Sequence, residues 1–223
     1  MQWSSILKPA KKVPLTHWSA KDPMTLKPKT KTVTILIIGL WIFGTGDAII
    51  IAAGIGVAPW TILAQGITEQ IEISVGQATF LVSLIVLMLW LPLRERPGIG
   101  TILNAILIAA AIDIMEPHLP HPEQYIFQII QAFFGTILVG IGSGLYLTSN
   151  LGPGPRDGWM TGIQRITEIP IGRVRATIEI LILIMGYYLG GTVGLGTVIF
   201  AFFIGPIVAI SLQLTGRFGK IKN

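Results

Sequence analysis

The amino-acid sequence predicts an all-α polytopic membrane protein with six transmembrane helices, arranged as two inverted three-helix repeats with short broken or re-entrant helices. Three observations lead to this prediction. Of the 223 residues, 52% are hydrophobic and only 12% are charged, with a mean hydropathy of +0.71, whereas a soluble domain carries about twice that share of charge. Long apolar runs recur along the chain, and a constant register relates its two halves.

The apolar runs define the expected spans. Each is long enough for an α-helix to cross an apolar layer of about 30 Å. They are residues 33–54, 76–93, 98–115, 126–149, 173–189 and 195–214. Two further stretches, 55–75 and 150–172, are broken by glycine and proline and carry charges, so we expect short re-entrant or interfacial helices there.

The two ends of the chain differ from the apolar part. Residues 1–32 contain seven lysines, four prolines and a single acidic residue, a composition that cannot bury a core. We expect a disordered polybasic cytoplasmic tail whose lysines contact anionic lipid headgroups at the bilayer surface. Residues 215–223 form the second basic end, again expected on the cytoplasmic side.

An internal repeat divides the membrane part. Adding 96 to the residue number takes Gly39 to Gly135, Pro59 to Pro155, Glu72 to Glu168 and Thr101 to Thr197 without a gap, among other matches. The repeats are residues 33–116 and 126–214, with three expected spans each. Since three is an odd number, the second repeat must enter the membrane from the opposite side and is therefore inverted.

The positions of the charges support this topology. With both termini cytoplasmic, all 16 lysines and arginines fall on the cytoplasmic side, as the positive-inside rule requires. If the two broken stretches also spanned the membrane, Arg94, Arg96 and Arg156 would lie outside. Six spans are therefore preferred to eight.

The glycine- and proline-rich breaks are the candidate binding site. Free N–H groups and the positive end of the helix dipole at a broken helix attract anionic or polar groups, and paired breaks in inverted halves indicate a transporter's site. The alternative is a pair of tight turns without a ligand. The candidate residues are Gly56, Pro59, Trp60, Gln65, Asn150, Gly152, Gly154, Pro155, Arg156 and Asp157. Asn104 is a further polar group that lines a path or bonds between helices.

Asp47 is the acidic residue of the first expected span. It lies about 14 residues into that span, roughly 20 Å from the cytoplasmic edge. A charged carboxylate at such a depth costs a few kcal/mol unless it is paired, protonated or in a wet cavity. Asp47 is therefore a candidate for proton coupling or cation binding, and the alternative is a protonated carboxyl group bonded to a neighbouring helix.

Arg175 and Glu179 are four residues apart and so share one face of the fifth expected span. One interpretation is a buried pair that neutralises itself. The other is a charge network at the cytoplasmic entrance that also includes Arg173, Arg156 and Asp157. Both interpretations stay open at this point.

Several function classes find no support in the sequence. There is no phosphate-binding loop with a lysine, no Ser/His/Asp set and no H-E-x-x-H motif, so we expect neither an enzyme nor a bound cofactor. The chain has no cysteine, and proline spacing around His118 and His121 argues against a metal site. No nucleic-acid-binding pattern is present.

The run from Asn150 to Gly162, NLGPGPRDGWMTG, followed by Ile178-Glu179 and by GGTVGLGT at 190–197, resembles the YczE/YyaS/YitT family of bacterial integral membrane proteins, closest to its YczE-like branch. The resemblance covers about residues 35–214. It implies a multi-pass protein of the bacterial cytoplasmic (inner) membrane. It also strengthens the prediction of a functional role for four residues, Arg156, Asp157, Arg175 and Glu179. It implies no substrate.

These observations favour a small secondary transporter that works by alternating access on a small polar or anionic solute, with proton coupling through Asp47 or Glu179. The alternative is a non-transporting accessory or regulatory membrane protein that acts through its tail and its glycine-rich faces. Whether the protein forms a homodimer is left open by the sequence.

Overall fold

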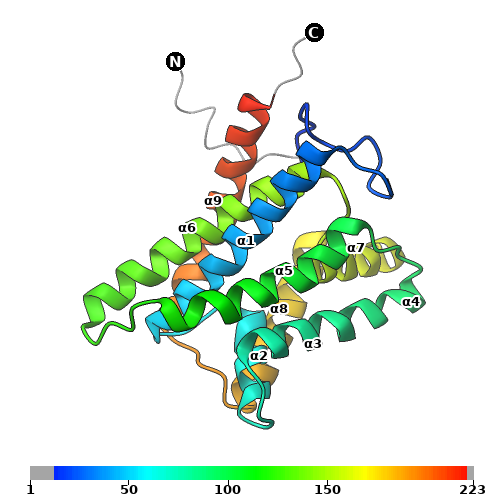
Figure 1. The fold of residues 1–223 in the computed structure, drawn as a ribbon. Helices are drawn as coiled ribbons and strands as arrows, with labels where there is room; N and C mark the ends of the chain where they lie inside the picture. Colours follow the sequence, from blue (N-terminus) through cyan, green and yellow to red (C-terminus); the bar gives the residue numbers. More distant parts are fainter. Residues whose placement is uncertain (1–12, 220–223) are drawn as a thin grey trace.

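The computed structural model describes residues 13–219, and every regular element in that range is a helix (Figure 1). The long helices are α1 (Thr30–Ala53), α3 (Val75–Met88), α5 (Ile99–Met115), α6 (Tyr125–Ser149), α8 (Ile171–Tyr188) and α9 (Leu195–Phe218). The short helices are α2 (Pro59–Thr68), α4 (Trp90–Leu93), η2 (Glu116–His118) and α7 (Pro155–Thr167). The all-helical prediction is confirmed, and both broken stretches contain a short helix that begins at a proline.

Among the described residues, five segments are long and apolar enough to cross a membrane. They are Thr30–Ala53, Val75–Leu93, Ile99–His118, Tyr125–Ser149 and Leu195–Phe218. Helix α8 has 18 residues but carries Arg173, Arg175 and Glu179, and it is not one of the five. Five of the six expected spans are thus supported by length and composition.

The helices form two groups, each packed around its own apolar core. The first helix group is α1, α5, α6 and α9, in which α1 packs along α5 and α6, and α6 along α9. The second helix group is α2, α3, α7 and α8, joined by a core that includes Trp60, Val82, Met160 and Ile178. Contacts of α5 with α3 and α7 connect the two groups.

Helices α1 and α6 lie side by side in antiparallel directions (Figure 1). Gly39 lies against Gly142 at one end of the contact and Gly46 against Gly135 at the other. A Cβ atom on Gly142 would lie 2.5 Å from the Gly39 carbonyl oxygen and 2.6 Å from the Phe43 nitrogen. These are backbone atoms that cannot rotate away, so the close approach of the helices depends on the absence of side chains.

We expect Gly142→Ala to destabilise the protein by roughly 1–3 kcal/mol, the usual cost of forcing an extra methyl group into a packed contact. Gly205→Ala is the matched control, because a Cβ atom there would have nothing within 4 Å. Melting temperatures of the two variants in detergent are the measurement. Equal melting temperatures would contradict the proposed packing.

The loops that precede α2 and α7 have the same backbone conformation. Gly56 and Gly152, which are 96 positions apart, have φ values of +104° and +107°. The Gly100 N–H donates to the Leu151 carbonyl at 2.7 Å, and the Gly196 N–H donates to the Ile55 carbonyl at 2.8 Å. Each loop is thus bonded to the first turn of a helix from the other half of the chain.

The described part of the basic N-terminal segment is packed rather than disordered. The His17 N–H donates to the Gly219 carbonyl and the Ala20 N–H to the Ser149 carbonyl, both at 2.9 Å. Trp18 is buried. The expectation of a disordered tail is therefore wrong for this part, because the segment supplies partners to free carbonyls at the ends of α6 and α9. Residues 1–12 and 220–223 lie outside the described residues.

Two corresponding helix pairs pack differently. Helix α3 lies against α5, where Asp113 accepts from the Gly76 N–H at 2.8 Å and from the Ser74 hydroxyl at 2.6 Å. The corresponding pair in the second half, 96 positions after α3 and α5, is α8 and α9. These two helices make almost no contact with each other. A Cβ atom at Gly172 or Gly205 would meet nothing within 4 Å, whereas one at Gly76 would overlap the Ala109 carbonyl oxygen.

Candidate functional site

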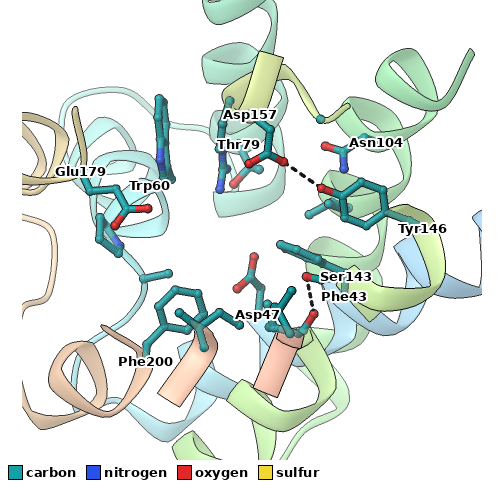
Figure 2. Close-up of a pocket in the computed structure, with 18 of the residues that line it drawn as sticks. Phe43, Asp47, Trp60, Thr79, Asn104, Ser143, Tyr146, Asp157, Glu179 and Phe200 are labelled. Atoms are coloured by element: carbon teal, nitrogen blue, oxygen red, sulfur yellow. Dashed lines mark hydrogen bonds between the residues drawn. The ribbon is translucent and has the colours of Figure 1, made fainter. Parts of the chain in front are cut away.

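A cavity of about 180 Å³ lies between the two helix groups (Figure 2). Helices α1, α5, α6 and α9 supply one wall, and α2, α3, α7 and α8 supply the other. The short helices α2 and α7 contribute their first turns, which include Trp60 and Arg156. Each begins with a proline, whose fixed φ and missing N–H suit the first position of a helix.

Positions 96 residues apart line the cavity together. Of its 22 lining residues, 16 form such pairs. The pairs are Phe43 with Val139, Asp47 with Ser143, Ala58 with Gly154, Trp60 with Arg156, Thr79 with Arg175, Ser83 with Glu179, Asn104 with Phe200, and Ile108 with Ile204. The cavity therefore lies where equivalent surfaces of the two halves face each other.

The paired positions differ in chemistry. The second half supplies Arg156, Arg175 and Glu179, where the first half has the neutral residues Trp60, Thr79 and Ser83. The first half supplies Asp47 opposite the neutral Ser143. The two halves thus place equivalent positions around the cavity but differ in the charges at those positions. A polar solute would therefore meet different chemical groups from the two halves.

Three of the charged groups have partners within the site. The Arg175 Nε atom donates to Glu179 at 2.8 Å. The Tyr146 hydroxyl donates to an Asp157 carboxylate oxygen at 2.8 Å, which links the two helix groups (Figure 2). The side chains of Arg175 and Glu179 are 55% and 33% exposed in the protein without its bilayer, and both line the cavity.

Arg156 and Asp47 are not paired in this way. The Arg156 guanidinium lies 5.0 Å from the centre of the Trp60 ring, a cation–π contact. Asp47 is only 3% exposed and points into the open centre of the cavity (Figure 2). Within residues 13–219, neither side chain has an ion pair or hydrogen bond.

Several predicted site residues line the cavity and others do not. Asp47, Pro59, Trp60, Gly154, Arg156, Asp157, Arg175 and Glu179 line it. Gly56, Gln65, Asn150, Gly152, Pro155 and Arg173 do not.

These six residues have other surroundings. Gly56 and Gly152 hold the loop conformation, Asn150 ends α6 and donates to the Ala20 carbonyl, and Gln65 accepts from the Thr192 N–H. The Pro155 carbonyl accepts from the Trp90 indole, and Arg173 is exposed.

The sequence interpretation missed part of the lining. Phe43, Thr79, Ser83, Ser143, Tyr146 and Phe200 were not among its candidates. The repeat itself was the signal for three of them, since Ser143, Thr79 and Ser83 are the 96-residue counterparts of Asp47, Arg175 and Glu179. Within the described range, no cluster of three or more possible ligands could hold a metal ion.

Comparison with known proteins places the chain among relatives. It is 42% identical over 209 residues to an uncharacterized protein of Haemophilus influenzae, covering 94% of this chain and 95% of the relative. It is 34% identical over 182 residues to the uncharacterized membrane protein YczE of Bacillus subtilis, covering 77% and 85%. It is 24% identical over 190 residues to the uncharacterized protein YyaS of the same organism, covering 83% and 94%.

No solved structure matches the chain. The profile of DUF6198, described as a family of unknown function, matches residues 30–213. The apolar helices and the similarity to a membrane protein indicate a multi-pass membrane protein, which contacts the bilayer. The chain therefore belongs to the DUF6198 family, and its similarity to YczE and YyaS bears out the YczE-like resemblance of its sequence.

Proposed function

We propose that this protein is a small secondary transporter that moves a small polar or anionic solute by alternating access. The observation that carries the proposal is the polar cavity between the two helix groups, lined by equivalent positions of the two halves. Sites of secondary transporters lie at such repeat interfaces, next to interrupted helices. Neither an enzyme nor a cofactor is part of the proposal.

The proposed architecture has six spans in two inverted repeats, 33–116 and 126–214. The antiparallel contact of α1 with α6 supports inversion, because these helices open the two repeats. The matched bonds of Gly100 with Leu151 and Gly196 with Ile55 support a two-fold relation. Helix α8 is the sixth span, and two of its charges, Arg175 and Glu179, line the cavity, where charged residues of a membrane helix are tolerated.

The difference between the two corresponding helix pairs supports alternating access. In the described conformation α3 is packed on α5, while α8 stands apart from α9. In the exchanged conformation, α8 would pack on α9 and α3 would leave α5. Gly172 and Gly205 would then form the close contact that Gly76 and Ala109 form here. With the termini cytoplasmic, the bonded start of α3 lies on the outer side and the start of α8, which stands apart from α9, lies on the cytoplasmic side. We therefore propose that the described conformation opens toward the cytoplasm.

This exchange is testable in a chain without cysteine. The double variant Gly172→Cys/Gly205→Cys should form an intramolecular disulfide slowly in the wild-type background. Adding Asp113→Asn should accelerate it, because the substitution weakens the bonds that hold α3 on α5. The second-half counterpart of Asp113 is Ala209, so α8 and α9 lack an equivalent restraint.

The measurement is the rate of disulfide formation in membranes, followed by a mobility shift after protease cleavage between the two cysteines. The two single-cysteine variants report any linkage between separate chains. No linkage in either background, or the same rate in both, would mean that the two helix pairs do not exchange and would overturn alternating access.

The remaining parts of the proposal are location, coupling and surface contacts. We propose the bacterial inner membrane with both termini cytoplasmic, because that orientation places all 16 lysines and arginines inside. Asp47 or Glu179 couples transport to protons, and the N-terminal lysines contact anionic lipid headgroups. An accessory protein, the rival function, predicts that Asp47→Asn leaves cellular function intact.

A further inference from the structure

Two opposite charges face the same cavity, and among residues 13–219 neither has an ion pair or a hydrogen bond. Asp47 belongs to the first helix group and Arg156 to the second. No ion pair joins them, so their charged atoms are more than 4.0 Å apart. The other charges of the cavity are engaged, since Arg175 binds Glu179 and Asp157 accepts from Tyr146.

The surroundings of Asp47 suit an ammonium group. Its carboxylate points to the open centre of the cavity, which Phe43 and Phe200 also line (Figure 2). A carboxylate accepts from the N–H groups of an ammonium ion, and aromatic rings attract a nearby cation. The neighbouring Ser143 hydroxyl donates to the Val139 carbonyl at 2.7 Å and so is not bonded to Asp47.

The surroundings of Arg156 suit a carboxylate. A guanidinium has five N–H donors in a planar fork that matches a carboxylate, and the Trp60 ring holds this one from one face. Two neutral donors also line the cavity without partners among residues 13–219. The Thr79 hydroxyl is buried and has no hydrogen bond, and the Asn104 side chain, 8% exposed, has none either.

We infer that the cavity binds a small zwitterion, with its ammonium group at Asp47 and its carboxylate at Arg156. The inference rests on the proposed function, because it names the solute of the same site. A cavity of about 180 Å³ accepts a molecule of roughly six to ten non-hydrogen atoms. A zwitterion bridges the two helix groups and satisfies both charges, whereas a simple anion or cation leaves one charge unpaired.

Binding to the purified full-length protein in detergent tests this inference without requiring transport. The zwitterionic probes are L-alanine, β-alanine and 4-aminobutyrate, which differ in the distance between their charges. Propionate and ethylamine each carry only one of the two charges. We expect at least one zwitterion to bind, measured by calorimetry and by the rise in melting temperature, and both singly charged probes to bind at least tenfold more weakly.

Asp47→Asn gives the sharper result. This variant should lose at least tenfold in affinity for the zwitterion and gain affinity for propionate, because the repelling carboxylate is gone while Arg156 remains. Glu123→Gln removes one negative charge from an exposed position outside the cavity and should bind as the wild type does. A variant that merely unfolds would bind neither probe and would show no cooperative melting transition.

The outcomes separate this inference from the proposed function. No binding by any of the three zwitterions, or equally tight binding of propionate or ethylamine to the wild type, overturns the inference. So does an Asp47→Asn variant that folds but does not change its preference. Zwitterion binding without uptake into proteoliposomes would overturn the transporter and leave the inference intact. Uptake of singly charged solutes but of no zwitterion would support the transporter and overturn the inference.

Discussion

Replacing Arg156 by glutamine is expected to reduce solute uptake at least tenfold while leaving the fold intact. The guanidinium lies over the Trp60 ring and has no ion pair within the described part of the chain. Arg156 is partly buried, so its removal costs the fold about 1–2 kcal/mol, between the exposed and the desolvated value of a cation–π contact. A charge-assisted hydrogen bond to solute is worth about 1.5–3 kcal/mol, so uptake should fall by at least tenfold.

Uptake into proteoliposomes is the measurement for Arg156→Gln, with a radiolabelled panel of amino acids, small carboxylates, phosphate and sulfate. Arg156→Lys is the informative companion, since it keeps the charge but loses the planar fork and the stacking on Trp60. We expect intermediate uptake from it. If Arg156→Gln transports at the wild-type rate, Arg156 does not contact the solute and the proposed site is wrong.

Glu179→Gln is expected to eliminate proton-driven accumulation of solute without unfolding the protein. The Arg175–Glu179 pair is four residues apart on one helix, and its side chains are 55% and 33% exposed. In a water-filled cavity such a pair stabilises a protein by only about 0.3–0.5 kcal/mol. Both residues line the cavity, so the functional loss should greatly exceed the structural one.

The Arg165–Glu95 pair provides a matched control outside the cavity. Its atoms are 3.0 Å apart and its side chains are 56% and 26% exposed, which is close to the exposure of the pair in the cavity. Glu95→Gln should therefore change neither melting temperature nor uptake under an imposed pH gradient. If Glu179→Gln unfolds while Glu95→Gln does not, the cavity pair is structural, and the charge-network interpretation fails.

Much of the fold could be predicted from local properties of the chain. Five of six expected spans, and the short helices that begin at Pro59 and Pro155, are found close to their predicted positions. The length of an apolar run predicts a span because the bilayer thickness sets the length that a helix needs to cross it. A proline predicts a helix start because its ring fixes φ at a value that suits the first helical position. The packing of the segment around Trp18 was not predictable, because it depends on carbonyls at distant helix ends.

The candidate site was only partly predictable. The breaks pointed to Trp60, Arg156 and Asp157, which line the cavity, whereas Gly56 and Gly152 hold the conformation of the loop backbone. A glycine motif does not reveal whether its free space is filled by a ligand or by another backbone. At Gly56 the space is filled by Gly194, a residue from the other half of the chain.

The sequence by itself determined the helical membrane class, the family and the 96-residue register, because these depend on composition, run length and local pattern. Only the tertiary structure decided which polar groups meet. It brought Asp47 and Arg156 to one cavity from different helix groups, with no ion pair to either among residues 13–219. These two residues are 109 positions apart in the sequence. Helix packing brings them to the same cavity, and no local sequence pattern encodes that packing.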